Sequence, residues 1–175
     1  MPVNIPAKKP RKFLSGAFTI DKWDNIDPYF QDLLKRDIKN VADLEKWLQD
    51  RSELETVLQE NLGWRYIRMT CDTKDARAAE EFNFFITEIE PKMAPLDNEL
   101  NLKLLNSPFL SEIKNEQYKI YLRDLKKKVE IYRDENVPLF TQIQSESQQY
   151  AVIAGAMSVE IDGKEYTLQQ AANFL

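Results

Sequence analysis

Residues 40–62, NVADLEKWLQDRSELETVLQENL, carry a strong helix signal in this chain of 175 residues. Apolar side chains recur three or four residues apart: Val41, Leu44, Trp47, Leu48, Leu54, Val57, Leu58 and Leu62. Asn40 precedes this row, and Ser52 with Glu55 has the pattern of a capping box. The stretch predicts two helices, or one helix bent near Asp50.

A shorter helix is predicted upstream, over residues 28–36. Asp27 and Pro28 form an N-cap and a first-turn proline ahead of an apolar row, which consists of Tyr29, Phe30, Leu33 and Leu34. The preceding residues 1–11, MPVNIPAKKPR, are basic and rich in proline, without an apolar run that could serve as the core of a signal peptide. We expect residues 1–12 to be flexible and the protein to be cytoplasmic.

Downstream, Asp72 and Asp75 indicate that a helix restarts. The apolar stripe that follows consists of Ala76, Ala79, Phe82, Phe85, Ile86, Ile89 and Met93, and it resumes at Leu96, Leu100 and Leu104. Pro91 and Pro95 should kink or divide this element, because proline has no amide proton and crowds the preceding turn. The element should end near Ser107 and Pro108.

Two further helices are predicted before the pattern changes. The first is defined by Tyr118, Tyr121, Leu122, Leu125, Val129 and Tyr132. The second opens at Asn136 and Pro138 and carries Leu139, Phe140, Ile143, Tyr150, Ala151 and Ile153. Gly155 is placed to end it in the left-handed conformation that C-cap glycines adopt.

Residues 157–175, MSVEIDGKEYTLQQAANFL, change to a period of two and predict a β-hairpin with its turn at Asp162-Gly163. Thr167 and Gln170 form a capping box that starts a final helix. A two-stranded hairpin and a helix of about eight residues are both marginal alone in water. We therefore expect this chain to be a piece of a longer protein.

Together these elements predict a mainly α fold, a multi-helix bundle of long antiparallel helices with one small C-terminal β-hairpin. The expected organisation is a flexible segment over residues 1–12, a helical lobe over 13–154, and a hairpin over 155–175 with the start of a helix that leads into a part of the protein outside this chain.

Composition excludes several classes of function. The net charge of -5 argues against a general nucleic-acid binder, and no apolar run is long enough to span a membrane. The chain contains no histidine, so it has no imidazole base or histidine metal ligand. Cys71 is the only cysteine, which excludes an intrachain disulfide, and we interpret it as a small buried apolar residue.

Several clusters could carry chemistry, but each has a simpler interpretation. The aromatic residues Trp64, Tyr66, Phe82, Phe84 and Phe85 could line a ligand groove, although their helical spacing favours core packing. The basic run 123–128 could bind an anion, but nearby acids favour a solvated helix face. The acidic pairs Glu80-Glu81 and Glu88-Glu90 are ordinary in so acidic a chain. We assign no catalytic, cofactor-binding or metal-binding residue in this chain.

Several stretches together resemble the N-terminal part of oligoendopeptidase F-like zinc metallopeptidases, the relatives of thimet oligopeptidase. They are DLEKWLQDRSELE (43–55), WRYIRMTCDT (64–73), FFITEIEPKMAPL (84–96), LLNSPFL (104–110) and GAMSVEIDGKEYTLQQAANFL (155–175). The resemblance implies a mainly helical lobe that forms a wall of a deep channel for short peptides. It also implies a zinc ion, held by a His-Glu-x-x-His helix in the C-terminal part of such enzymes.

None of those catalytic residues can be placed in a chain without histidine. The parent protein is expected to be a zinc metalloendopeptidase, and this chain its non-catalytic lobe. Its expected partners are short peptide substrates and the missing catalytic domain, with no nucleic acid and no membrane. An exposed surface left by truncation could also support a dimer. The alternative is a stand-alone helical adaptor that binds a peptide or protein in a groove between helices.

Overall fold

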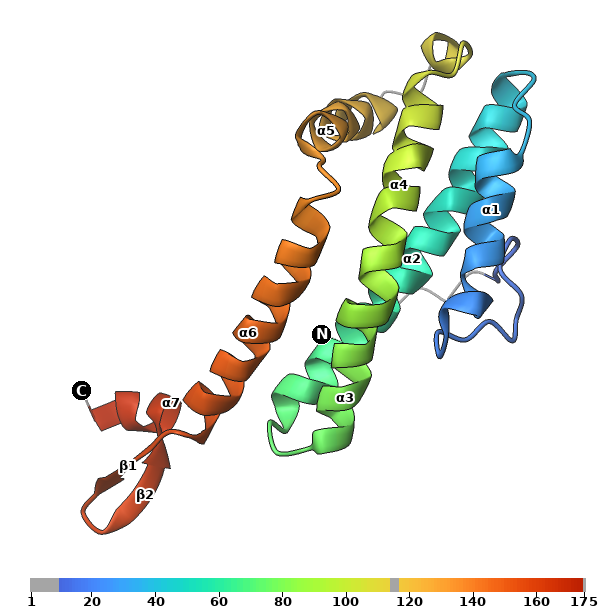
Figure 1. Cartoon of the computed structure of the whole chain (residues 1–175). Helices are drawn as coiled ribbons and strands as arrows, with labels where there is room; N and C mark the ends of the chain where they lie inside the picture. Colours follow the sequence, from blue (N-terminus) through green and yellow to red (C-terminus); the bar gives the residue numbers. More distant parts are fainter. Residues whose placement is uncertain (1–9, 114–116, 175) are drawn as a thin grey trace, which may run out of the picture. The chain divides into compact units, whose positions relative to one another are not determined.

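The structure, a computed structural model, describes residues 10–113 and 117–174 (Figure 1). Its α-helices are α1 (Asp27–Lys35), α2 (Val41–Cys71), α3 (Ala76–Phe84), α4 (Glu90–Leu105), α5 (Gln117–Ile131), α6 (Asn136–Ala156) and α7 (Leu168–Ala171). The short 3₁₀-helices are η1 (Trp23–Asn25), η3 (Leu110–Glu112) and η4 (Ala172–Phe174), and η2 (Phe85–Ile89) is a π-helix. Strands β1 (Ser158–Ile161) and β2 (Lys164–Thr167) form the hairpin. The predicted fold class is confirmed. Residues 1–9, part of the segment expected to be flexible, lie outside the described residues.

The chain divides into two compact units. The first contains the described residues up to Gln59 together with Glu99–Lys127, and the second contains Glu60–Asn98 and the described residues from Lys128 onward. Helices α2 and α4 therefore contribute residues to both units, and each unit has buried apolar residues of its own.

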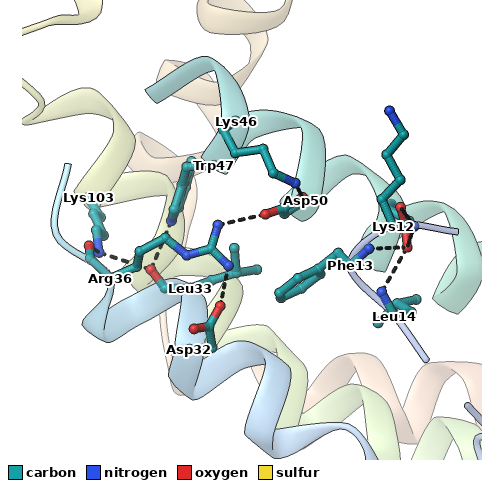
Figure 2. A network of polar contacts seen from close by, with 11 residues as sticks. Lys12, Phe13, Leu14, Asp32, Leu33, Arg36, Lys46, Trp47, Asp50 and Lys103 are labelled. Atoms are coloured by element: carbon teal, nitrogen blue, oxygen red, sulfur yellow. Dashed lines mark hydrogen bonds and ion pairs between the residues drawn. The ribbon is translucent and has the colours of Figure 1, made fainter. Parts of the chain in front are cut away.

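The core of the first unit is built largely from α1, α2 and α4. Its buried apolar residues are Leu14, Ile20, Ile26, Phe30, Leu33, Leu44, Trp47, Leu48, Leu54, Val57, Leu58, Leu100, Leu104 and Leu125. Trp47 is completely buried, and its Nε1 donates to the carbonyl oxygen of Leu33 at 2.8 Å (Figure 2). Burying one large apolar side chain stabilises a fold by roughly 1.5–3 kcal/mol. The predicted apolar row of α2 thus faces this core from Leu44 to Leu58.

The C-terminal end of α1 is capped by a lysine from α4. Lys103 Nζ donates to the carbonyl oxygens of Leu33, Leu34 and Arg36 at 2.9, 2.7 and 2.6 Å. The last carbonyl groups of a helix have no partner within the helix, and an ammonium group carries three donors. All three donors of Lys103 are used here. Burial of the ammonium group lowers the pKa of Lys103.

α2 is one continuous helix, so of the two predicted alternatives the one with two helices is wrong. Asn40 caps the helix, because its Oδ1 accepts from the amide of Asp43 at 2.9 Å. The Ser52–Glu55 pattern, in contrast, lies inside the helix, and the Glu55 carboxylate binds Arg51 Nε at 2.6 Å. A glycine inside a helix costs only about 1 kcal/mol relative to alanine, so Gly63 does not stop α2 before Cys71.

In the second unit, the end of α2 packs against α3. Met69, Ala78, Phe82 and Ile86 form a buried apolar cluster, with Leu62 and Ala79 against it. Asp75 is the N-cap of α3, and its Oδ1 accepts from the amides of Arg77 and Ala78 at 3.0 and 3.1 Å. The predicted helix restart is therefore confirmed.

Pro91 and Pro95 were expected to kink or divide the element that follows Asp75. They do not divide it, so that alternative is wrong. α3, η2 and α4 follow one another without a non-helical residue, and Pro95 lies inside α4. The helical hydrogen bonding is irregular at one place, a π-turn in which the amide of Glu90 donates to the carbonyl of Phe85, five residues back. Pro91, which has no amide proton, follows this turn directly.

Two predicted helix ends differ from the structure. Asp27 is the first residue of α1, and the N-cap is Ile26, which makes no side-chain capping bond. Gly155 has no positive φ, and α6 continues to Ala156 with Met157 as C-cap. A Cβ at position 155 would lie 3.4 Å from the Thr73 side chain, so this glycine lies at a close approach and does not end the helix.

The hairpin has the predicted turn. β1 and β2 are antiparallel, with Val159 opposite Tyr166. Asp162 and Gly163 have φ angles of 53° and 73°, and positive φ at both central residues is the requirement of a type I′ turn. Thr167 and Gln170 form the predicted capping box at the start of α7. The turn and the capping box each depend on residues within a few positions of one another, and both predictions are confirmed.

We expect Lys103→Met to lower the free energy of unfolding by about 1–3 kcal/mol, because the carbonyl groups of Leu34 and Arg36 lose this donor and that of Leu33 keeps only the bond from Trp47. Urea unfolding followed by circular dichroism measures this change. Lys126→Met makes the same substitution at an exposed position of α5 and should change stability by no more than about 0.5 kcal/mol. Equal stabilities of the two variants would show that the cap contributes nothing.

Candidate functional surfaces

Glu53 of α2 binds the chain segment that precedes the first helices. Its carboxylate accepts from the backbone amides of Lys12, Phe13 and Leu14 at 2.9, 3.0 and 2.8 Å (Figure 2). Hydrogen bonds from several amides to one carboxylate are charge-assisted and stronger than neutral ones. Glu53 therefore fixes the path of this segment along α2.

A buried carboxylate lies close to that segment in the first unit. Asp50 is almost completely buried and accepts from Arg36 Nη1 at 2.7 Å, and Lys46 Nζ also pairs with it (Figure 2). Arg36 pairs with Asp32 as well, and its guanidinium carbon lies 5.3 Å from the centroid of the Phe13 ring. The charges of this network are matched within the fold, so we assign it a structural role.

Arg51 is a second buried charge that joins α2 to α4. Its guanidinium binds Asn101 Oδ1 and Glu55, and it lies 5.6 Å from the Trp47 ring. Arg51 and Asn101 are both almost fully buried. Since removal of one partner of a buried charge is costly, these contacts stabilise the pairing of the two helices.

The aromatic cluster predicted to pack in the core is divided in the structure. Phe82 and Phe85 are buried, and Phe84 is half-buried. The core prediction is wrong for Trp64 and Tyr66, whose side chains are more than half exposed. Trp64 follows the inward-facing Leu62 by two residues, which turns it to the outer face of the continued helix α2. Tyr66 packs one side of its ring against Phe82, with the ring centroids 5.9 Å apart.

The other residues singled out from sequence lie mostly on the surface. Cys71 is exposed, so its predicted burial is wrong: α2 continues to this residue and places it beside the turn that leads to α3. Lys126, Lys127 and Lys128 are exposed beside the buried Leu125. The predicted solvated face of the basic run is therefore confirmed.

The acidic pairs are engaged in ordinary surface contacts. Glu81 pairs with Arg77 at 3.1 Å, and Glu88 pairs with Lys92 at 3.2 Å. Glu90 is more buried and bonds to Gln144 of α6. Burial raises the pKa of Glu90, and the Gln144 hydrogen bond lowers it by less.

α6 exposes its large apolar side chains and partly buries several polar ones. The exposed residues are Leu139, Phe140, Ile143, Tyr150 and Ile153. The partly buried polar residues are Thr141, Gln144, Ser145 and Gln148. Sequence periodicity identified the apolar row of this helix, but periodicity alone does not show which face another element covers.

The described residues contain no group of side chains that could bind a catalytic metal ion. The chain has no histidine, and residues 10–113 and 117–174 contain no group of three or more Cys, Asp or Glu placed to hold a metal ion. A zinc ion therefore does not fit the residues that the structure describes. Across the same residues, no helix has the length and apolar character needed to cross a membrane.

Comparison with known proteins gives the class of protein to which these surfaces belong. Residues 13–132, more than half of the chain, match the family model described as the Peptidase M3 N-terminal domain. The chain belongs to this family, which confirms the predicted resemblance at the level of a peptidase N-terminal part. No curated protein and no solved structure matched the chain. The family match ends at Tyr132, so α6, the hairpin and α7 follow the matched region.

We expect Glu53→Gln to release the segment around Phe13. Burial raises the pKa of Glu53, but the amides of Leu14, Lys12 and Phe13 together lower it below the usual glutamate value. A lowered folded-state pKa stabilises the fold above the usual pKa, and this contribution is lost as pH falls through the lower folded value.

At pH 7, Glu53→Gln should therefore hold the segment around Phe13 as weakly as the wild type does at a pH below the folded-state pKa of Glu53. Amide hydrogen exchange of residues 12–14, corrected for intrinsic rates, should accelerate by about tenfold. Glu45→Gln changes an exposed glutamate of the same helix and should leave these rates unchanged. Unchanged protection in Glu53→Gln would contradict the role assigned to this carboxylate.

We expect Glu90→Gln to stabilise the protein at pH 7. Because burial raises the folded-state pKa of Glu90, its favourable contribution is complete below the usual glutamate pKa and is lost as pH rises through the higher folded value. The stability gap between the variant and the wild type should shrink as pH falls towards about 4. Urea unfolding at both pH values measures it, with the exposed Glu80→Gln as control. A gap of the same size at both pH values would contradict this account.

Proposed function

We propose that this chain is the N-terminal lobe of a zinc-dependent oligoendopeptidase that hydrolyses short peptides. In this proposal the lobe forms a wall of the substrate channel and is not itself catalytic. The observation that carries the proposal is the family match over residues 13–132. The resemblance of the stretches around residues 64–73 and 155–175 to oligoendopeptidase F-like enzymes supports the narrower assignment.

The chemistry of the chain supports a non-catalytic role. Zinc peptidases bind the metal through three protein ligands, which are histidines and a carboxylate in thermolysin-like sites. With no histidine available, the zinc ion and the water that it activates must be held by residues outside this chain. Three of the acids singled out from sequence, Glu81, Glu88 and Glu90, are engaged with Arg77, Lys92 and Gln144.

The packing of the first unit supports a role in limiting substrate size. A wall that admits short peptides and excludes folded proteins must hold its shape. α2 extends over 31 residues, and in the first unit its buried Trp47, Asp50 and Arg51 are tied to α1 and α4. Such a scaffold is suited to shaping a channel.

A second candidate is a stand-alone helical adaptor. The apolar side chains exposed along α6 favour it, because such a row can bind an amphipathic partner helix. The two candidates differ in one respect: only the first requires that the complete protein contains a peptidase centre.

We expect the reading frame of the source gene to continue into a His-Glu-x-x-His motif. The full-length protein should contain about one zinc ion per chain and cleave quenched fluorescent peptides, and a chelator should abolish cleavage. Elemental analysis and the peptide assay measure both. The 175-residue chain should do neither. Zinc binding with cleavage by this chain alone, or a frame without the motif, would overturn the proposal.

A further inference from the structure

A row of exposed side chains with regular spacing runs along α6. Leu139, Ile143, Tyr150 and Ile153 are exposed by 54%, 57%, 72% and 64%, and the exposed Glu146 stands between them. We call these five residues the α6 seam. Successive members lie four, three, four and three residues apart, so they share one narrow face of the helix.

This spacing identifies the kind of structure that fits the seam. Alternating steps of three and four residues are the pattern by which one helix packs along another. The partly buried side of α6 is mixed, because it carries Gln144 and Gln148 together with smaller apolar residues such as Val152. The large apolar side chains of the seam are nevertheless the exposed ones, which is unusual for a surface helix. An apolar helix is the partner that would bury the seam.

The charge on α6 restricts the partner further. Glu146 is the only charged residue of α6, and it lies at the middle of the seam. Symmetric pairing with a second copy of α6 would bring two Glu146 carboxylates together, and like charges at a contact are unfavourable. Without lysine or arginine, α6 has no charge to attract phosphate groups of membranes or nucleic acids. The complementary surface is an apolar protein helix with a lysine or arginine opposite Glu146.

The position of the seam in the chain points to the source of that helix. The family match ends at Tyr132, and α6 begins at Asn136, so the seam lies on the first helix after the matched N-terminal domain. We propose that the α6 seam receives an apolar helix of the peptidase's catalytic part, with a basic side chain against Glu146. This inference rests on the proposed function, because that function supplies the catalytic part.

Cysteine labelling tests whether the seam is covered. In a Cys71→Ser background, Ile143→Cys and Ile153→Cys place thiols on the seam, and Gln149→Cys places one at an exposed position of α6 outside it. The rate of reaction with N-ethylmaleimide is measured for each, in the 175-residue chain and in the full-length protein. The seam thiols should react about tenfold or more slowly in the full-length protein, and the thiol at position 149 should react at a similar rate in both.

Three other results would overturn the proposal, and they can be told apart. If the full-length protein binds zinc and cleaves peptides but its seam thiols react as fast as in the 175-residue chain, this inference fails and the proposed function stands. If the full-length protein does neither, both fail. Seam thiols that react slowly in the 175-residue chain and faster on dilution would show that a second copy covers the seam instead.

The charge of Glu146 gives a second readout in the full-length protein. Glu146→Lys would place a cation against the basic side chain of the partner helix and should accelerate labelling at Ile153→Cys severalfold. Gln149→Lys also introduces a lysine on α6, but outside the seam, and should leave that rate unchanged. Equal rates in these two variants would overturn the assignment of a basic partner residue.

Discussion

The first unit depends on one constraint: the carbonyl groups at the C-terminal end of α1 must find hydrogen-bond donors outside the helix. A helix end leaves carbonyl groups without partners inside the helix, and burying them unpaired would be costly. Here Trp47 of α2 and Lys103 of α4 supply the donors. Both donors can reach Leu33 only when three segments that are distant in the chain lie together. The buried Asp50 adds to this, because its partner Arg36 directly follows α1.

Two carboxylates of the first unit also have their partners within the fold. The carboxylates of Asp50 and Glu53 are bound to Arg36 and Lys46 and to the amides of residues 12–14. These groups hold helices and a chain segment in place. In the function proposed here, the contribution of the lobe is its shape, and the chemistry belongs to the part that holds the zinc.

Sequence periodicity predicted most of the elements, because amphipathic spacing and caps are local properties. The row along α2, the helix restart after Asp75, and the Asp162-Gly163 turn all appear in the structure. The errors have other causes. The two-helix alternative assumed that the helix stops near Asp50, but packing along α2 carries the helix past this residue. The burial of Cys71 was inferred from the usual behaviour of a lone cysteine, but this residue lies at the exposed end of α2.

The sequence by itself determined the helical class, the hairpin and the absence of histidine, since each depends on residue identity or on neighbours within a few positions. Only the tertiary structure decided that Lys103 caps a helix about 70 residues earlier, and that the row on α6 is exposed. The physical reason is that a helical repeat specifies that a face is apolar, but contacts between distant segments decide which face is buried.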